Sequence, residues 1–278
     1  FPSGEWGFGR FLFRSRLENN KRKELVTFLH AAAGFPVVDT WVKAIRNGQY
    51  ATWPGLTSAI VYRNLPKSNE TIKGHLNHQW QNIRSTQHAP DSENHDTKER
   101  THNVFAAVVD YRAEVFTNAT GPFPVVSSMG NKYVFLLYDF DSNYIMVEPV
   151  KDRKKGTTVA AYKKQSNILK RCGLKPKLQK LDNEASQMLL EYIEDENINY
   201  QLVPPHMHRR NLAERAIQTF KSHFISMLCG CDPGFPLHLW CRLLPQAEIT
   251  LNLLRTSRMN PKLAAYAQVH GQFDYNQT

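Results

Sequence analysis

Apolar residues between positions 21 and 66 recur at the spacing of an α-helix. Three groups share this spacing: Leu25, Phe28, Leu29 and Ala32; Val38, Trp41, Val42 and Ile45; Leu56, Ile60 and Val61. Glycine and proline separate the groups, and these residues end helices. The pattern predicts a small three-helix module at 21–66, built around Phe28 and Trp41. The Gly-rich, basic residues 1–20 predict a flexible N-terminal segment, and the polar residues 67–103 predict a linker.

From residue 104 the apolar runs become short and dense, which is typical of strands. Strands are predicted at 104–109, 114–118, 133–138, 144–147, 177–181 and 200–203, with a hairpin joining 133–138 to 144–147. Helices are predicted at 151–172, 185–196, 209–228 and 235–255, with a kink at Pro245 in the last. A run of strands followed by alternating helices and strands predicts a mixed sheet with helices packed against it. We expect this α/β domain to span 104–256, with a C-terminal extension at 257–278.

The helix predicted at 209–228 has two distinct faces. Ala213, Ile217, Phe220 and Phe224 follow one apolar stripe and are expected to face the sheet. Glu214, Gln218 and Lys221 lie beside that stripe on a polar face. The helix is therefore expected to hold polar groups at the margin of the core.

Composition narrows the classes of partner. The chain has 278 residues, 41% of them hydrophobic, and a net charge of +10, so it can build a core and suits an anionic partner such as nucleic acid. Solubility alone is the other explanation of that charge. No apolar run reaches membrane-spanning length, which argues against an integral membrane protein. The chain begins with Phe1 and not with an initiator Met, and no secretory signal follows. We therefore expect a piece of a longer polypeptide that is not secreted.

The spacing of the cysteine and histidine residues indicates whether a zinc site is expected. The four cysteines, Cys172, Cys229, Cys231 and Cys241, form no Cys-x-x-Cys pair and stand beside no histidines at finger spacing. Free thiols are therefore expected, and no zinc.

Two carboxylates carry the candidate chemistry. Asp182 follows the strand at 177–181 and precedes a helix, and Glu214 lies in the first turns of the helix at 209–228. Alone, Asp182 is explained as a helix N-cap and Glu214 as a solvated helix residue. Together, the intervening helix, strand and Pro-Pro turn return Glu214 to the strand end where Asp182 stands. Two carboxylates placed in this way can share a divalent metal, as phosphoryl transfer on nucleic acid requires.

Five strings in this region carry a family resemblance: residues 117–124, 127–133, 181–184, 202–206 and 209–216. Together they resemble the integrase core of copia-type retrotransposon polyproteins, over residues 104–256. The resemblance implies a ribonuclease-H-like fold, with three acidic residues and Mg²⁺ or Mn²⁺. It implies processing of element DNA ends and their joining to target DNA by a homo-oligomer. It also implies a location in the nucleus or an intracellular retroelement particle.

This sequence departs from the family at the first acid. The second acid falls on Asp182 and the third on Glu214, but the first position holds Asn118. An amide oxygen can bind a hard cation but brings no charge, so we expect a weakened metal site and impaired catalysis. Two alternatives stay open: a non-enzymatic DNA-binding or assembly module, and an active enzyme that uses Asp110, Asp139 or Asp141 instead. Retroviral-type integrases carry a zinc module of two histidines and two cysteines before the core. This module is not expected here, because His30 and His75 are present but no cysteine precedes Cys172.

Basic and polar residues around the two carboxylates are the candidate DNA contacts. They are Lys180, Arg209, Arg210, Arg215, Gln218 and Lys221. We expect them to contact phosphates without reading base sequence. The alternative is that they are solubility charges.

Overall fold

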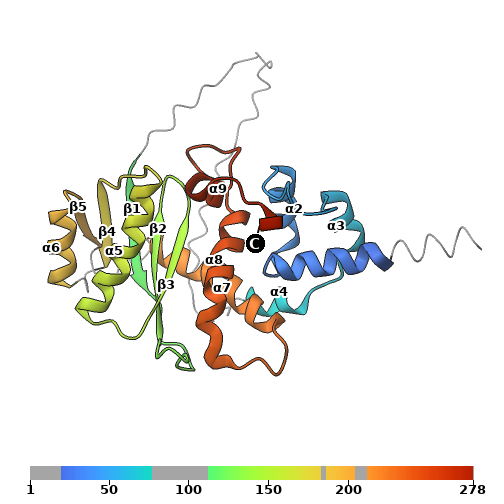
Figure 1. Ribbon diagram of the computed structural model, residues 1–278, viewed down its shortest axis with the longest axis horizontal. Coiled ribbons are helices and arrows are strands. Elements are labelled where there is room, and N and C mark those ends of the chain that lie inside the picture. The colour runs from blue at the N-terminus through green and yellow to red at the C-terminus, as the bar shows by residue number, and fades with distance from the viewer. Residues whose placement is uncertain (1–19, 77–111, 183–185, 204–211, 278) are drawn as a thin grey trace, which may run out of the picture.

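The computed structural model describes residues 20–76, 112–182, 186–203 and 212–277. In Figure 1 a β-sheet lies at one end of the molecule, the N-terminal helices lie at the other end, and α7 and α8 lie between them. The predictions for residues 1–19, 77–111, 183–185 and 204–211 lie outside the described residues, including the strand at 104–109, Asp110, Arg209 and Arg210.

Five strands form one mixed sheet in the order β3-β2-β1-β4-β5. They are β1 (Glu114–Ala119), β2 (Tyr133–Asp139), β3 (Ile145–Val150), β4 (Leu178–Asp182) and β5 (Asn199–Val203). The first three pair antiparallel, whereas β1 with β4 and β4 with β5 pair parallel. The predicted hairpin is confirmed as β2–β3.

Helices cover both faces of this sheet. On one face α5 (Lys155–Arg171) and α6 (Gln187–Asp195) bury Tyr162, Leu169 and Ile193 against Val115 and Leu181. On the other face lie α7 (Leu212–Gly230) and α8 (Leu244–Leu254). The predicted α/β, ribonuclease-H-like fold class, a mixed sheet flanked by helices, is confirmed.

The apolar stripe of α7 packs as predicted. Ala213, Ile217, Phe220 and Phe224 are each at most 8% exposed. They form one cluster with Phe116 of β1 and with residues of β2. Because the stripe runs along the helix, α7 is held against the sheet from its first turn.

The predicted kink at Pro245 is wrong. A 3₁₀ helix, η2 (Leu237–Leu243), ends just before it, and α8 begins at Leu244 with Pro245 in its first turn. Proline is tolerated there because the first N–H groups of a helix need no partner within the helix. Two shorter helices therefore replace one kinked helix.

The N-terminal module contains the predicted helices, at residues 20–32, in α2 (Val38–Arg46) and in α3 (Ser58–Asn64). Trp41 is fully buried, as expected. Phe28 is not a core residue, because 61% of it is exposed. The first helix instead turns Val26 and Leu29 inward, which directs Phe28 to solvent.

The segment predicted as a linker begins with ordered structure. Asn69–Gly74 form α4, which packs against α7. A Cβ on Gly74 would clash with Ser226 Oγ and the Ser222 carbonyl, so the two helices approach closely only because Gly74 has no side chain. The α4 contact ties the N-terminal module to the sheet domain.

The C-terminal segment also packs against that module. It forms α9 (Ala265–His270) and the short η3 (Tyr275–Gln277). The rings of Tyr275 and Trp53 lie 4.7 Å apart, and Thr52 Oγ1 donates to the Phe273 carbonyl at 3.1 Å. Residues far apart in sequence therefore share one apolar core.

Candidate functional site

The register between β1 and β4 brings two predicted site residues to one edge of the sheet. Glu114 pairs with Leu178, Val115 with Gln179 and Phe116 with Lys180. Continued by two residues, this register sets Asn118 across from Asp182, which itself pairs with Val203 of β5. The register thus puts Asn118 and Asp182 at the same level, at the carboxyl ends of two parallel strands that are neighbours in the sheet.

Glu214 approaches the same edge from α7. It lies in the first turn of the helix, is partly buried and directly follows the fully buried Ala213. Leu212, at the start of α7, lines a cavity of about 480 Å³ together with Val203 and Phe116. The beginning of α7 therefore lies by the end of β5, and the fold delivers Glu214 to the region where the register sets Asn118 and Asp182.

Asn118 is engaged with its own backbone. Its Oδ1 accepts a hydrogen bond from the N–H of Ala119 at 2.7 Å, and the residue is partly buried. Strand alternation puts it on the same face as Phe116, which packs toward α7. The neighbouring Thr117 belongs to the opposite face, where Gln179 Nε2 donates to its Oγ1 at 2.9 Å. Asn118 therefore stands on the α7 side of the edge, without a charge.

Asp139 and Asp141 are structural residues of the β2–β3 turn. Asp139 Oδ2 accepts from the N–H of Ser142 at 2.8 Å, and burial raises the pKa of this carboxyl group. Asp141 accepts from the backbone N–H of Ala113 at 2.6 Å. Because Asp139 pairs with Val115, it lies three residues, or about 10 Å, from the level of Asn118. The register therefore argues against either residue as a substitute for the missing acid at position 118.

The predicted DNA contacts differ in their surroundings. Lys180 Nζ forms an ion pair with Glu114 Oε2 at 3.1 Å and lies 5.2 Å from the centre of the Phe116 ring. Arg215, Gln218 and Lys221 are exposed on α7. Lys180 thus has an internal partner, whereas the α7 residues present their polar groups to solvent.

Two residues near the start of β1, at the end away from Asn118, were not predicted from the sequence. Arg112 and Phe140 line the same cavity as Lys180 and Phe116, and the Arg112 guanidinium lies 4.8 Å from the centre of the Phe140 ring. Cations beside aromatic rings suit the phosphates and bases of nucleic acid. Arg112 precedes a strand and Phe140 lies in a turn, so neither stands in a motif that would have indicated it.

No group of three His, Cys, Asp or Glu side chains able to hold a metal is found among the described residues. Within the same residues no helix has both the length and the apolar character to cross a bilayer.

Comparisons with known proteins return structural matches alone. No protein-family model matches the chain, and no curated protein does. The HTLV-2 integrase catalytic core domain in complex with magnesium is similar in its trimeric form, at 21% identity and a TM-score of 0.43, over 57% of this chain and 97% of that chain. Its dimeric form gives 20% identity and a TM-score of 0.41, over 57% and 96%.

A third match is the simian T-cell lymphotropic virus intasome in complex with PP2A regulatory subunit B56 gamma. It has 12% identity and a TM-score of 0.39, over 57% of this chain and 55% of that chain. The fold assignment rests on the strand order and directions of the sheet itself.

Proposed function

We propose that this chain is the integrase core of a copia-type retrotransposon polyprotein. Its ancestral activity is metal-dependent processing of element DNA ends and their transfer into target DNA, and Asn118 impairs that activity. One observation carries the proposal: the β1–β4 register sets Asn118 across from Asp182 at the strand edge that the first turn of α7 also approaches.

The residues at this edge offer oxygen ligands of the type that a hard divalent cation prefers, but one of the three brings no negative charge. Asp182 and Glu214 would supply carboxylate oxygens to Mg²⁺ or Mn²⁺, and Asn118 an amide oxygen that already accepts from Ala119. When bound, such an ion polarises the phosphate and activates the attacking oxygen. With two carboxylates instead of three, these residues neutralise less of the cation charge. We therefore propose strongly reduced joining activity.

DNA is the proposed partner. Exposed Arg215, Gln218 and Lys221 on α7 would hold phosphates beside the edge, together with Arg209 and Arg210 earlier in the chain. Lys180 and Arg112 would add charge within the adjoining cavity. The net charge of +10 supports the same partner. A homo-oligomer in the nucleus or in an intracellular retroelement particle is the setting that this function requires.

A joining assay tests the enzymatic part of the proposal. The unmodified chain and Asn118→Asp are compared in end processing and strand transfer with Mg²⁺ and with Mn²⁺. We expect activity to appear or rise with Asn118→Asp, and to vanish again when Glu214→Gln is added to it. Full activity of the unmodified chain would show that Asn118 does not impair the site.

A non-enzymatic DNA-binding or assembly module is the second candidate. The hydrogen bond from Ala119 to Asn118 favours it, because the amide then serves the strand end as a structural group. Salt-dependent DNA binding together with an inactive Asn118→Asp variant would support this candidate over the enzyme.

A further inference from the structure

A second cavity lies along the free edge of β3, the edge strand on the opposite side of the sheet from β4 and β5. Its volume is about 500 Å³, and its walls come mainly from β3, α5, η2, α8 and α9. This size suits a small organic ligand. The cavity shares no residue with the one lined by Phe116 and Lys180, so its chemistry can be considered on its own.

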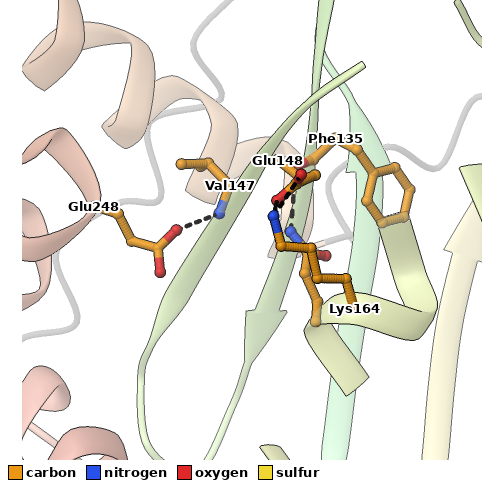
Figure 2. Close-up of polar contacts among 6 residues, drawn as sticks. Phe135, Val147, Glu148, Lys164 and Glu248 are labelled. Carbon is orange, nitrogen blue, oxygen red and sulfur yellow. Dashed lines mark hydrogen bonds and ion pairs between the residues drawn. The ribbon is translucent and has the colours of Figure 1, made fainter. Parts of the chain in front are cut away.

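Glu248 of α8 places a carboxylate in this cavity. Its Oε2 accepts from the N–H of Val147 at 2.8 Å, and its Oε1 accepts from the hydroxyl of Tyr144 at 2.9 Å. Figure 2 shows Glu248 on one side of β3, with the Glu148–Lys164 pair on the other side. Glu248 is partly exposed. The carboxylate therefore keeps acceptor capacity beyond its two hydrogen bonds.

Three aromatic rings stand beside this carboxylate. The His270 ring lies 5.4 Å from the ring of Tyr144 and 5.0 Å from the ring of Tyr266, measured between centroids. All three residues line the cavity. Aromatic rings next to a carboxylate are the chemistry that recognises organic ammonium ions, since the ring faces and the carboxylate both attract positive charge.

The residues that line the cavity have more unused hydrogen-bond acceptors than unused donors. When Glu248 is ionised, the hydroxyl proton of Tyr144 goes to Glu248, and His270 Nε2, 3.1 Å from the Tyr144 oxygen, is then the donor in that contact. A neutral His270 then has an acceptor at Nδ1, and burial lowers the pKa of this ring and so favours its neutral form. Lys164 Nζ is paired with Glu148 at 2.7 Å.

Gln165, another lining residue, holds a buried acceptor next to the cavity. The residue is 2% exposed, and its Oε1 has no hydrogen-bond partner among the described residues. A buried acceptor without a partner is costly. The Tyr144 hydroxyl and the Val147 N–H both donate to Glu248, and the Lys164 ammonium is directed to Glu148. A ligand that fits the cavity is therefore expected to bring donors of its own.

We propose that this cavity binds an organic ammonium ion, with its charged group among Glu248, Tyr266 and His270 and its apolar stem against Met146, Ile168 and Ile249. Burial raises the pKa of Glu248 to about 7, with Glu148 acting in the same direction and Lys164 opposing it. The other titratable groups that line the cavity around this carboxyl group are Tyr144, Cys241, Tyr266 and His270. A bound cation would favour the ionised carboxylate, so binding at neutral pH should release protons.

Calorimetric titration of the full chain with three probes of matched size tests the proposal. Phenethylamine carries the positive charge, phenethyl alcohol is neutral and phenylacetate is negative. We expect phenethylamine to bind about tenfold or more tightly than the other two, the scale of a charge-assisted hydrogen bond. We also expect its heat to differ between buffers of different ionisation enthalpy, because a proton leaves Glu248.

Two variants locate the site. Glu248→Gln and Tyr266→Leu should each weaken phenethylamine binding, and Glu248→Gln should also remove the buffer dependence. Glu191→Gln, an exposed glutamate on α6, is the matched control and should leave binding unchanged. If Glu248→Gln does not fold, Tyr266→Leu with circular dichroism as a check of folding still gives the answer. No binding at millimolar phenethylamine, equal binding of the three probes, or binding that both folded variants retain would overturn the proposal.

Discussion

Asn118 on β1 lies across from Asp182 on β4, two residues beyond the last Cα pair of the parallel ladder, Phe116 with Lys180. This pairing joins two segments that are far apart in the sequence. It means that Asn118, at a position where the resembled family has an acid, lies level with the strongest candidate acid on the neighbouring strand.

The first prediction concerns metal affinity at that edge. Asn118→Asp should bind Mn²⁺ more tightly than the unmodified chain by on the order of tenfold, because a third carboxylate adds charge that a hard cation favours. Calorimetric titration with Mn²⁺ measures this directly, without any need for catalysis. Asn197→Asp, at an exposed position just after α6, is the control for a general gain of negative charge and should change the affinity little.

The second prediction concerns the exposed cations of α7. Lys221→Gln should weaken DNA binding to a similar extent for unrelated sequences, and it should lower the salt slope by about 0.9 for each phosphate that is no longer neutralised. Fluorescence anisotropy across a range of salt concentrations measures both. Lys43→Gln, at an exposed position on α2, keeps the change in net charge equal and should leave the slope unaltered. The same weakening in both variants would mean that only net charge matters.

The third prediction concerns the α4–α7 contact. Gly74→Ala should lower the free energy of unfolding by about 1–3 kcal/mol, because the new Cβ meets the Ser226 side chain and the Ser222 backbone. Gly156→Ala in α5 is the matched control: no atom lies within 4 Å of its new Cβ, and replacing a helical glycine is neutral or stabilising. Urea denaturation of both variants measures the difference. An undisturbed Gly74→Ala would show that the helices can separate at little cost.

The fourth prediction concerns the pH dependence of stability at Glu248. Its pKa is about 7 in the folded chain and 4.5 for an unperturbed glutamate, so the folded state holds the proton more tightly than the unfolded state. The stabilising contribution of this group is therefore fully present below pH 4.5 and is lost as the pH rises through 7. Glu248→Gln cannot ionise.

It follows that Glu248→Gln should gain stability relative to the unmodified chain as the pH rises. Partial exposure reduces the effect, and a gain of about 1–3 kcal/mol between pH 5 and pH 8 is expected. Urea unfolding at the two pH values measures it. Equal differences at both pH values would contradict a raised pKa at this site.

Local patterns in the sequence were sufficient where the governing contacts are local. The apolar stripe of α7 predicted which face is buried, and the alternation around residues 133–147 predicted the β2–β3 hairpin. Both follow from side-chain periodicity within one or two neighbouring elements. The position of Asn118 near a strand end and the placement of Glu214 in the first turn of α7 were also available from sequence, because each depends on a single element.

Tertiary structure decided everything that depends on which elements meet. The parallel pairing of β1 with β4, and hence the level of Asn118 beside Asp182, comes from a long crossover that no local pattern specifies. Phe28 is exposed rather than in the core because the first helix rotates to bury Val26 and Leu29 instead. The Glu248 cavity combines side chains from five separate elements, β3, α5, η2, α8 and α9. These side chains can act on one ligand only because burial and long-range packing bring them together. The periodicity of a single segment contains information on neither burial in the fold nor long-range packing.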